Sequence, residues 1–126
     1  MSFRDKIYTR LEQMALSDFS DIVESSKIVE GKLRLMLCDG SFIDIWLSAK
    51  RKGVYAYHWE RRAIDGTIYR HNNLPDREAR KLKTFPKHFH DKLEQTLMES
   101  HISDIPDEAM RSFLSFAREL LKKRRK

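Results

Sequence analysis

The sequence predicts an α+β fold in which an antiparallel sheet of about four strands packs against an N-terminal and a C-terminal helix. Three observations predict this fold. Two Asp-Gly pairs each lie between short apolar runs, helix periodicity is clearest at the two ends of the chain, and 126 residues suit one hydrophobic core. We therefore expect residues 1–126 to form a single domain.

The first predicted element is a helix over residues 3–16. Phe3, Ile7, Leu11 and Met14 recur at helical spacing, and Ser2 with Asp5 can form a capping box at its start. Residues 17–26 are rich in turn formers and small polar residues, so they predict a connector.

Residues 27–73 predict strands. Asp39-Gly40 lies between the runs 32–38 and 41–47, and Asp65-Gly66 lies between 55–62 and 67–72. Asp-Gly flanked in this way is the strongest short-range hairpin signal, so a four-strand meander is the simplest arrangement.

Three aromatic residues and one cysteine in this segment favour packing roles. Tyr55, Tyr57 and Trp59 are predicted to be core or half-buried strand residues, with base stacking as the alternative. Cys38 is predicted to be a packed residue or a strand-end thiol rather than a nucleophile. A single cysteine also excludes a disulfide within the chain.

The sequence from residue 74 onward predicts a charged segment followed by two further helices. Residues 74–84 are expected to be a loop or a short exposed helix, and residues 91–99 a helical stretch. Ser103 to Glu108 has the cap residues, proline and acids of a helix start, and the residues after it keep an apolar stripe. That stripe, with Phe113 and Phe116, is predicted to belong to the core.

The balance of charge makes a polyanion such as RNA the first partner to consider. Lys and Arg number 25 against 19 Asp and Glu, which gives a formal charge of +6. Basic clusters lie at 50–52 and at 122–126, and a solvated surface is the alternative for each. The residues that we expect to contact nucleic acid are Arg61, Arg62, Asn73, Lys87, Lys122, Lys123, Arg124 and Arg125.

The sequence predicts a cytoplasmic protein that does not bind membranes. No apolar run approaches the roughly 18 residues that a membrane span needs, and the N-terminus has no signal-peptide core. The sequence leaves the oligomeric state open, and a homodimer is one of the states allowed.

Four of the five histidines lie between residues 58 and 90, which makes this segment the candidate site. A two-residue loop at Asp65-Gly66 would place Glu60 opposite His71 and His58 opposite Asn73. These four side chains would then share one sheet face, and Tyr55, Tyr57, Trp59, Arg70 and Asn72 would share the other.

Three interpretations of the histidines remain open. They can be unrelated surface or hydrogen-bonding residues, or they can carry out acid–base chemistry on a phosphodiester that Arg70 holds. Alternatively, His88, His90 and an upstream histidine can bind a metal such as zinc. We favour acid–base chemistry without a metal or other cofactor, with His58 or His88 as base, His90 as acid and Arg70 as the transition-state cation.

Residues 28–90 resemble the TumE family, the toxin halves of prokaryotic toxin–antitoxin pairs. The matching residues are Gly31-Lys32-Leu33-Arg34-Leu35, Asp39-Gly40-Ser41, Tyr55-Ala56-Tyr57-His58-Trp59, Arg70, Asn73, Pro75, Phe85-Pro86, His88 and His90. The chain departs from the family pattern at Asn72, where the family has aspartate, and at Asp76, Arg77 and Lys87, where it has histidines.

The resemblance implies a cognate antitoxin and an inhibitory effect on growth. RNA cleavage is our extension of it. If the replaced residues carry the family's activity, this copy is weakened or inactive. Two alternatives to the toxin remain: a non-catalytic nucleic-acid-binding module, and a protein-interaction domain that docks a partner through its C-terminal helix.

Overall fold

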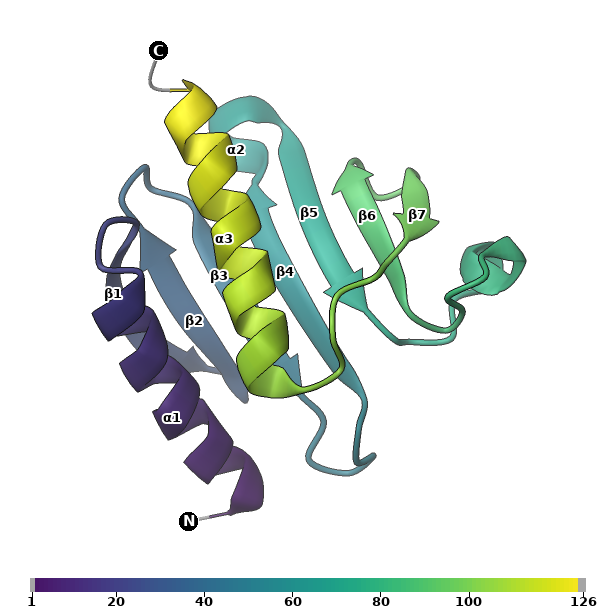
Figure 1. Ribbon diagram of the computed structural model, residues 1–126, viewed down its shortest axis with the longest axis horizontal. Helices are drawn as coiled ribbons and strands as arrows, with labels where there is room; N and C mark the ends of the chain where they lie inside the picture. Colours follow the sequence, from purple (N-terminus) through teal and green to yellow (C-terminus); the bar gives the residue numbers. More distant parts are fainter. Residues whose placement is uncertain (1, 125–126) are drawn as a thin grey trace.

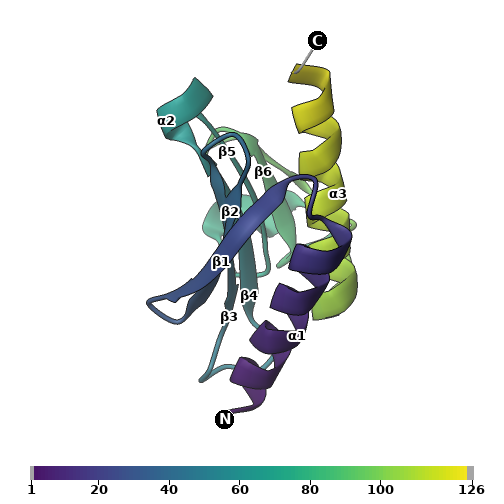
Figure 2. The same ribbon diagram turned by 90° about the vertical axis from the view of Figure 1, so that its left-hand side faces the viewer.

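The computed structural model describes residues 2–124, which form two layers (Figures 1 and 2). One layer is a seven-stranded antiparallel sheet whose strands lie in chain order, so that each strand pairs with its neighbours in sequence. The other layer is the two terminal helices, which lie on the same face of the sheet. The α+β class is confirmed, and the expected number of about four strands is wrong.

The first helix, α1, spans Phe3–Asp18. The predicted capping box is confirmed, because the Ser2 hydroxyl accepts from the Asp5 amide and the Asp5 carboxylate accepts from the Ser2 amide. Tyr8 and Leu11 are buried against the sheet. The Tyr8 hydroxyl donates to the Gly31 carbonyl (2.8 Å) and accepts from the Leu47 amide (2.9 Å), which ties the helix to two strand ends.

The expected connector over residues 17–26 is wrong in its second half, because β1 spans Val23–Val29 and pairs with β2, Lys32–Leu37. β1 is an edge strand with mostly exposed side chains, so its sequence lacks the apolar alternation that would reveal it. Glu30 and Gly31 both have positive φ (50° and 77°), as a two-residue hairpin turn of this kind requires.

Both Asp-Gly hairpins exist. The first joins β2 to β3, Phe42–Leu47, and the second joins β4, Tyr55–Arg61, to β5, Thr67–Asn72. The second hairpin does not have the expected two-residue loop. A one-turn helix, α2 at Arg62–Asp65, precedes a left-handed Gly66 and lengthens the connection.

The predicted helix over residues 91–99 is wrong. This part of the chain holds β6, His88–Lys92, and β7, Leu97–Glu99, which extend the sheet beyond β5. Pairing with β5 and burial decide the conformation of β6, and local spacing cannot reveal them. The expectation for 74–84 is confirmed, because a short 3₁₀-helix, η1, spans Arg77–Lys81.

The C-terminal helix α3, Pro106–Arg124, lies across the middle of the sheet (Figure 1). Its stripe is core as predicted, since Met110, Phe113 and Leu114 are at most 1% exposed, while Phe116 is partly buried against the same cluster. Tyr57 and Trp59 are also buried. Cys38 directly follows β2 and is exposed, so it is a strand-end thiol and not a packed residue. Within residues 2–124, no helix is long and apolar enough to cross a membrane.

Replacing Phe113 with alanine should lower the free energy of unfolding by roughly 3–5 kcal/mol, because the ring is fully buried beside Tyr57 and Phe89. Chemical denaturation of the isolated protein measures this loss. Ser115→Ala, at an exposed position of the same helix, is the matched control and should change stability by less than about 0.5 kcal/mol. Equal stability of the two variants would show that the stripe is not core.

Candidate functional site

The two long helices both lie on one face of the sheet and leave the opposite face without a long helix (Figure 2). The strand registers place the polar side chains of the site on that opposite face. Residues with even numbers from β2 to β6 point to this face, and the pairing register aligns one from each strand in a row. The row consists of Arg34, Asp44, His58, Arg70 and His90. Most apolar side chains of these strands point to the helix side, so the ionisable side chains gather on the opposite face, where a ligand can reach those that are exposed.

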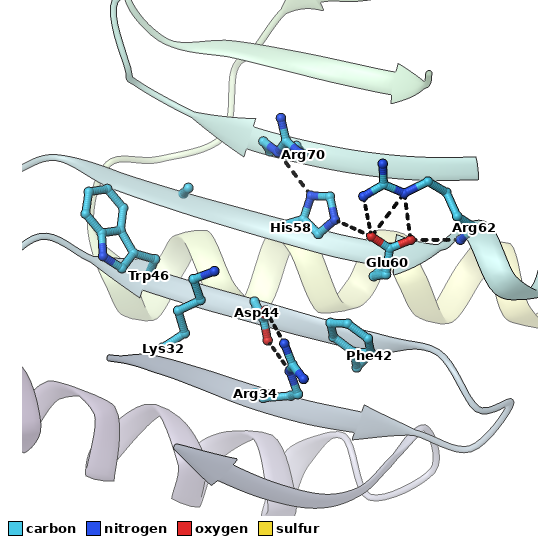
Figure 3. A pocket seen from close by; sticks show the side chains of 10 residues that line it. Lys32, Arg34, Phe42, Asp44, Trp46, His58, Glu60, Arg62 and Arg70 are labelled. Atoms are coloured by element: carbon cyan, nitrogen blue, oxygen red, sulfur yellow. Dashed lines mark hydrogen bonds and ion pairs between the residues drawn. The ribbon is translucent and has the colours of Figure 1, made fainter. Parts of the chain in front are cut away.

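On the same face, four side chains from β4, α2 and β5 are linked by a continuous series of hydrogen bonds (Figure 3). Arg70 donates from Nε to Nδ1 of His58 (3.0 Å), and His58 Nε2 lies 3.1 Å from Glu60 Oε1. Arg62 closes the chain on Glu60 with its guanidinium (2.6 Å) and its backbone amide (2.9 Å). Hydrogen bonds from Arg62 lower the pKa of Glu60 to about 2, so Glu60 is a carboxylate.

These contacts fix the tautomer of His58. An arginine only donates, so Nδ1 must hold the lone pair, and the proton sits on Nε2 facing the Glu60 carboxylate. Burial lowers the pKa of His58 below its ordinary value, which favours this neutral form. Both ring nitrogens are therefore engaged, and the ring orients Arg70.

Arg70 reaches the last part of the sheet through its other nitrogens. Nη1 and Nη2 donate to the two oxygens of Glu94 (2.9 and 2.7 Å), in the turn between β6 and β7. Half of the Glu94 side chain is exposed (47%). Arginine also binds a phosphate in this geometry, in which its two Nη atoms each donate to a different oxygen of the same ligand.

A hollow of about 390 Å³ lies on the same face over β2, β3 and β4. It places the aromatic rings of Phe42 and Trp46 beside cationic side chains (Figure 3). Arg34 forms a two-point ion pair with Asp44 (2.8 and 2.9 Å). Its Cζ atom lies over the Phe42 ring, 3.9 Å from the ring centroid. The ionisable side chains that line the hollow are the cations Lys32, Arg34, Arg62 and Arg70, the acids Asp44 and Glu60, and neutral His58.

His88 and His90 lie beside each other on β6, with ring centroids 4.9 Å apart. His90 pairs with Arg70 across the strands, and His88 pairs with Asn72. The structure thus brings all four expected catalytic residues to one face, in the order His58, Arg70, His90 from strand to strand, with His88 beside His90.

The expected pairing of Glu60 with His71 and of His58 with Asn73 is wrong. His58 lies opposite Arg70, and Glu60 lies opposite Ile68, because α2 lengthens the connection. The pairing is shifted by an odd number of residues, so β5 presents the opposite set of side chains to each face. Arg70 and Asn72 join His58, and His71 moves to the helix side.

His71 is a core residue in consequence. It is fully buried, stacks on Tyr57 (5.7 Å between centroids) and exchanges a hydrogen bond with the Ser100 hydroxyl through Nδ1 (2.8 Å). Burial, with a smaller effect of the nearby Lys87 ammonium, lowers the pKa of His71 to about 4. His71 therefore stays neutral at physiological pH and does not reach the polar face.

Three of the residues expected to contact nucleic acid hold the fold together. Arg61 is 2% exposed and pairs with Asp39 (2.6 Å) and Asp65 (3.2 Å). The Asn73 side chain accepts from the Tyr55 amide and donates to the Gly53 carbonyl. Lys87 donates from Nζ to the carbonyl of Ile102 (2.7 Å).

The other expected contacts divide between the two sides of the sheet. Arg62 is exposed at the rim of the hollow. Lys122 and Lys123 are exposed near the end of α3, on the helix side. The side chain of Arg124, and Arg125 as a whole, lie outside the described residues. Lys122 and Lys123 therefore do not belong to the same surface as the hollow.

The β2–β3 part of the face and the acid Glu94 were not predicted from the sequence. The alternation Phe42, Asp44, Trp46 was a usable signal, because it matches Lys32 and Arg34 in phase once the first hairpin is accepted. Glu94 had no such signal, because its position depends on strand pairing beyond β5.

The fold and the site define a small α+β domain in which the sheet face opposite the two long helices carries a cation-rich hollow and a buried histidine pair. A family model described as toxin TumE matches residues 7–124, and the chain therefore belongs to the TumE toxin family. The family resemblance of the sequence is confirmed, and a toxin family suggests an antitoxin partner. No match to the chain is found among curated proteins or among solved structures.

The pKa of His71 predicts a loss of stability in acid. The unfolded chain takes up the proton near pH 6.5 and the folded protein only near pH 4, so stability falls as the pH falls between these values. Between pH 7.5 and pH 5, His71 should account for a loss of about 2 kcal/mol. Denaturant titrations of wild type and of His71→Gln at both pH values measure it.

The His71→Gln variant should lose less stability over this interval than wild type, because the other histidines titrate in both proteins. An identical pH dependence of the two proteins would show that His71 is not held neutral by the core.

Proposed function

We propose that this TumE-family protein is a toxin that binds single-stranded RNA across the open sheet face and cleaves it there. The observation that carries the proposal is the cross-strand row that ends in Arg70 and His90, beside a hollow with both aromatic rings and cations. Cations bind phosphates and rings stack on unpaired bases, which is the combination that single-stranded nucleic acids require.

Arg70 is the proposed phosphate-binding residue. His58 fixes its Nε, so the outer nitrogens are oriented before a ligand arrives. Glu94 occupies them in the free protein, but the pair is partly exposed and worth only ~1 kcal/mol. A phosphate can therefore replace the Glu94 carboxylate on the same fork at small cost.

Phe42 and Trp46 are the proposed contacts for bases. Both rings line the hollow and are only partly buried, unlike Trp59, which is fully buried. The volume of about 390 Å³ lies in the range of small-ligand sites. An RNA strand would run from these rings over His58 towards Arg70 and β6.

The histidine pair is the proposed chemical centre, because both rings have a defined tautomer. The two rings are buried in the free protein, so RNA reaches them only if the chain around them moves. His88 Nδ1 donates to the Pro86 carbonyl (2.8 Å), and His90 Nδ1 donates to the Glu94 carbonyl (2.7 Å). A carbonyl oxygen only accepts, so the lone pair of each neutral ring lies on Nε2. His88 is the better of the two candidate bases, since the His58 lone pair is already bound to Arg70.

Without a metal, cleavage would follow the acid–base route that the sequence suggests. His88 takes the proton of a 2′-hydroxyl, and the 2′-oxygen forms a bond to phosphorus. The P–O5′ bond breaks as a protonated His90 gives its proton to the departing 5′-oxygen. Arg70, opposite His90, stabilises the extra negative charge on the phosphorus oxygens. This route stays a prediction, and it requires Nε2 of both rings to be free of a metal ion.

The two other functions expected from the sequence have weaker support. The stripe of α3 is covered by the sheet, so a partner cannot dock on it without unfolding the core. A non-catalytic nucleic-acid-binding module would use the same hollow but leaves the tautomers of His88 and His90 without a role. A homodimer remains a prediction.

Glu94→Gln should bind a single-stranded RNA about fivefold more tightly than wild type at low salt, because it frees Arg70 from its carboxylate. Arg70→Gln should bind more weakly. Fluorescence anisotropy at two salt concentrations measures both, and affinity should fall steeply with salt. Glu119→Gln removes the same charge from an exposed position of α3 and is the control, with at most a small gain.

The same samples test cleavage after incubation and gel electrophoresis. The acid–base route predicts products from RNA and none from the 2′-deoxy strand, which lacks the nucleophile. Binding without any products would support the non-catalytic module instead, and failure of wild type to bind at low salt would contradict the whole proposal.

A further inference from the structure

Asp76, His88 and His90 form a cluster that the hydrogen-bond chain of Arg70 and His58 does not include. One potential ligand atom from each of the three lies within 4.8 Å of the other two. The two imidazoles are buried (1% and 4% exposed) on adjacent outward positions of β6. Asp76 arrives from the segment that follows β5 and leads into η1.

Both imidazoles have the arrangement typical of metal-binding histidines. Such a histidine donates its second ring N–H to a carbonyl or carboxylate, which orients the ring and leaves the other nitrogen for the metal. Here the Pro86 and Glu94 carbonyls bind Nδ1–H of His88 and His90. In residues 2–124, the structure shows no hydrogen bond to Nε2 of either ring.

The Asp76 carboxylate is also held in place. Its Oδ1 accepts from the Glu78 amide (3.0 Å) at the start of η1, so the side chain serves as the N-cap of this short helix. A carboxylate that is fixed at one oxygen still offers the other oxygen to a cation. The third donor is thus an acid that follows a proline and not an upstream histidine.

We infer that Asp76, His88 and His90 form a binding site for a divalent transition-metal ion such as Zn²⁺. Two imidazole nitrogens and one carboxylate suit such ions, whereas Mg²⁺ and Ca²⁺ prefer oxygen donors throughout. The Asp76 carboxylate also adds a negative charge beside the two imidazole donors, which favours a cation over a phosphate. The neighbouring Arg70 charge is offset by Glu94.

The geometry requires a modest contraction on binding. Zinc–ligand distances of 2.0–2.2 Å place the ligand atoms of a tetrahedral site roughly 3.3 Å apart, so atoms now within 4.8 Å move together by at most roughly 1.5 Å. Three protein donors leave one position for water, as in catalytic rather than structural zinc sites. A bound metal would also fasten the segment between β5 and β6 to the sheet.

The inference concerns the same histidines as the proposed function but does not rest on RNA cleavage. A metal on Nε2 of both rings prevents them from exchanging protons with RNA, so it replaces the acid–base route. Metal binding can be measured without RNA, and RNA cleavage can be measured in chelator. The two proposals can therefore fail separately.

The test is calorimetric titration of chelator-treated protein with Zn²⁺. Wild type should bind one ion per chain and gain thermal stability with added Zn²⁺. Asp76→Asn removes the charge but keeps an oxygen that can cap η1, and it should weaken Zn²⁺ binding by more than about tenfold. His90→Gln should do the same. His101→Gln removes a histidine whose side chain is 80% exposed and should leave binding unchanged.

The proposed site would be overturned if Asp76→Asn bound Zn²⁺ as tightly as wild type does. It would also be overturned if wild type bound no Zn²⁺. Loss of binding in His101→Gln would assign the ion to the surface near Glu99 instead and would also overturn the inference. Because Asp76 is only partly buried, its variant keeps the test valid even if His90→Gln does not fold.

Discussion

The pairing of β4 with β5 is the constraint on which the rest of the site depends. α2 sets the connection so that His58 lies opposite Arg70, and β6 then continues the row with His90. Side chains alternate along a strand, so a shift of one residue would exchange the two faces of β5. His71 would then be the outward residue and Arg70 would be buried among aromatic rings. The same register that fills the core with His71 therefore assembles the polar face.

The two faces of the sheet carry different kinds of side chain. The helix side holds the aromatic and aliphatic cluster around Phe113 and Trp59, and a change there is expected to act through folding. The open side holds polar groups that constrain each other: Glu60 and Arg70 fix His58, and His58 fixes Arg70. Backbone carbonyls fix His88 and His90 in the same way. Such mutual fixation keeps catalytic and ligand-binding groups in one geometry before a ligand binds.

The elements with a strong local signal in the sequence were predicted correctly. The Asp-Gly turns located both hairpins, the stripe of α3 located the core helix, and the family motifs located His58, Arg70, His88 and His90. Edge strand β1 and the β6–β7 hairpin were missed because their conformation depends on pairing partners. The register was missed because nothing local distinguishes α2 from a tight turn. In the sequence, Asp76 is only a position where the family has a histidine. The path of the folded chain places its carboxylate beside His88 and His90.

The central claim is that the toxin acts through its open sheet face, and growth of bacteria on induced expression tests it most directly. Arg70→Gln and Arg118→Gln each remove one ion-paired arginine, the first from the open face and the second from α3, where Arg118 pairs with Asp21. At matched levels of soluble protein, wild type and Arg118→Gln should arrest growth, and Arg70→Gln should not. Equal arrest by all three, or growth unaffected by wild type, would contradict the account.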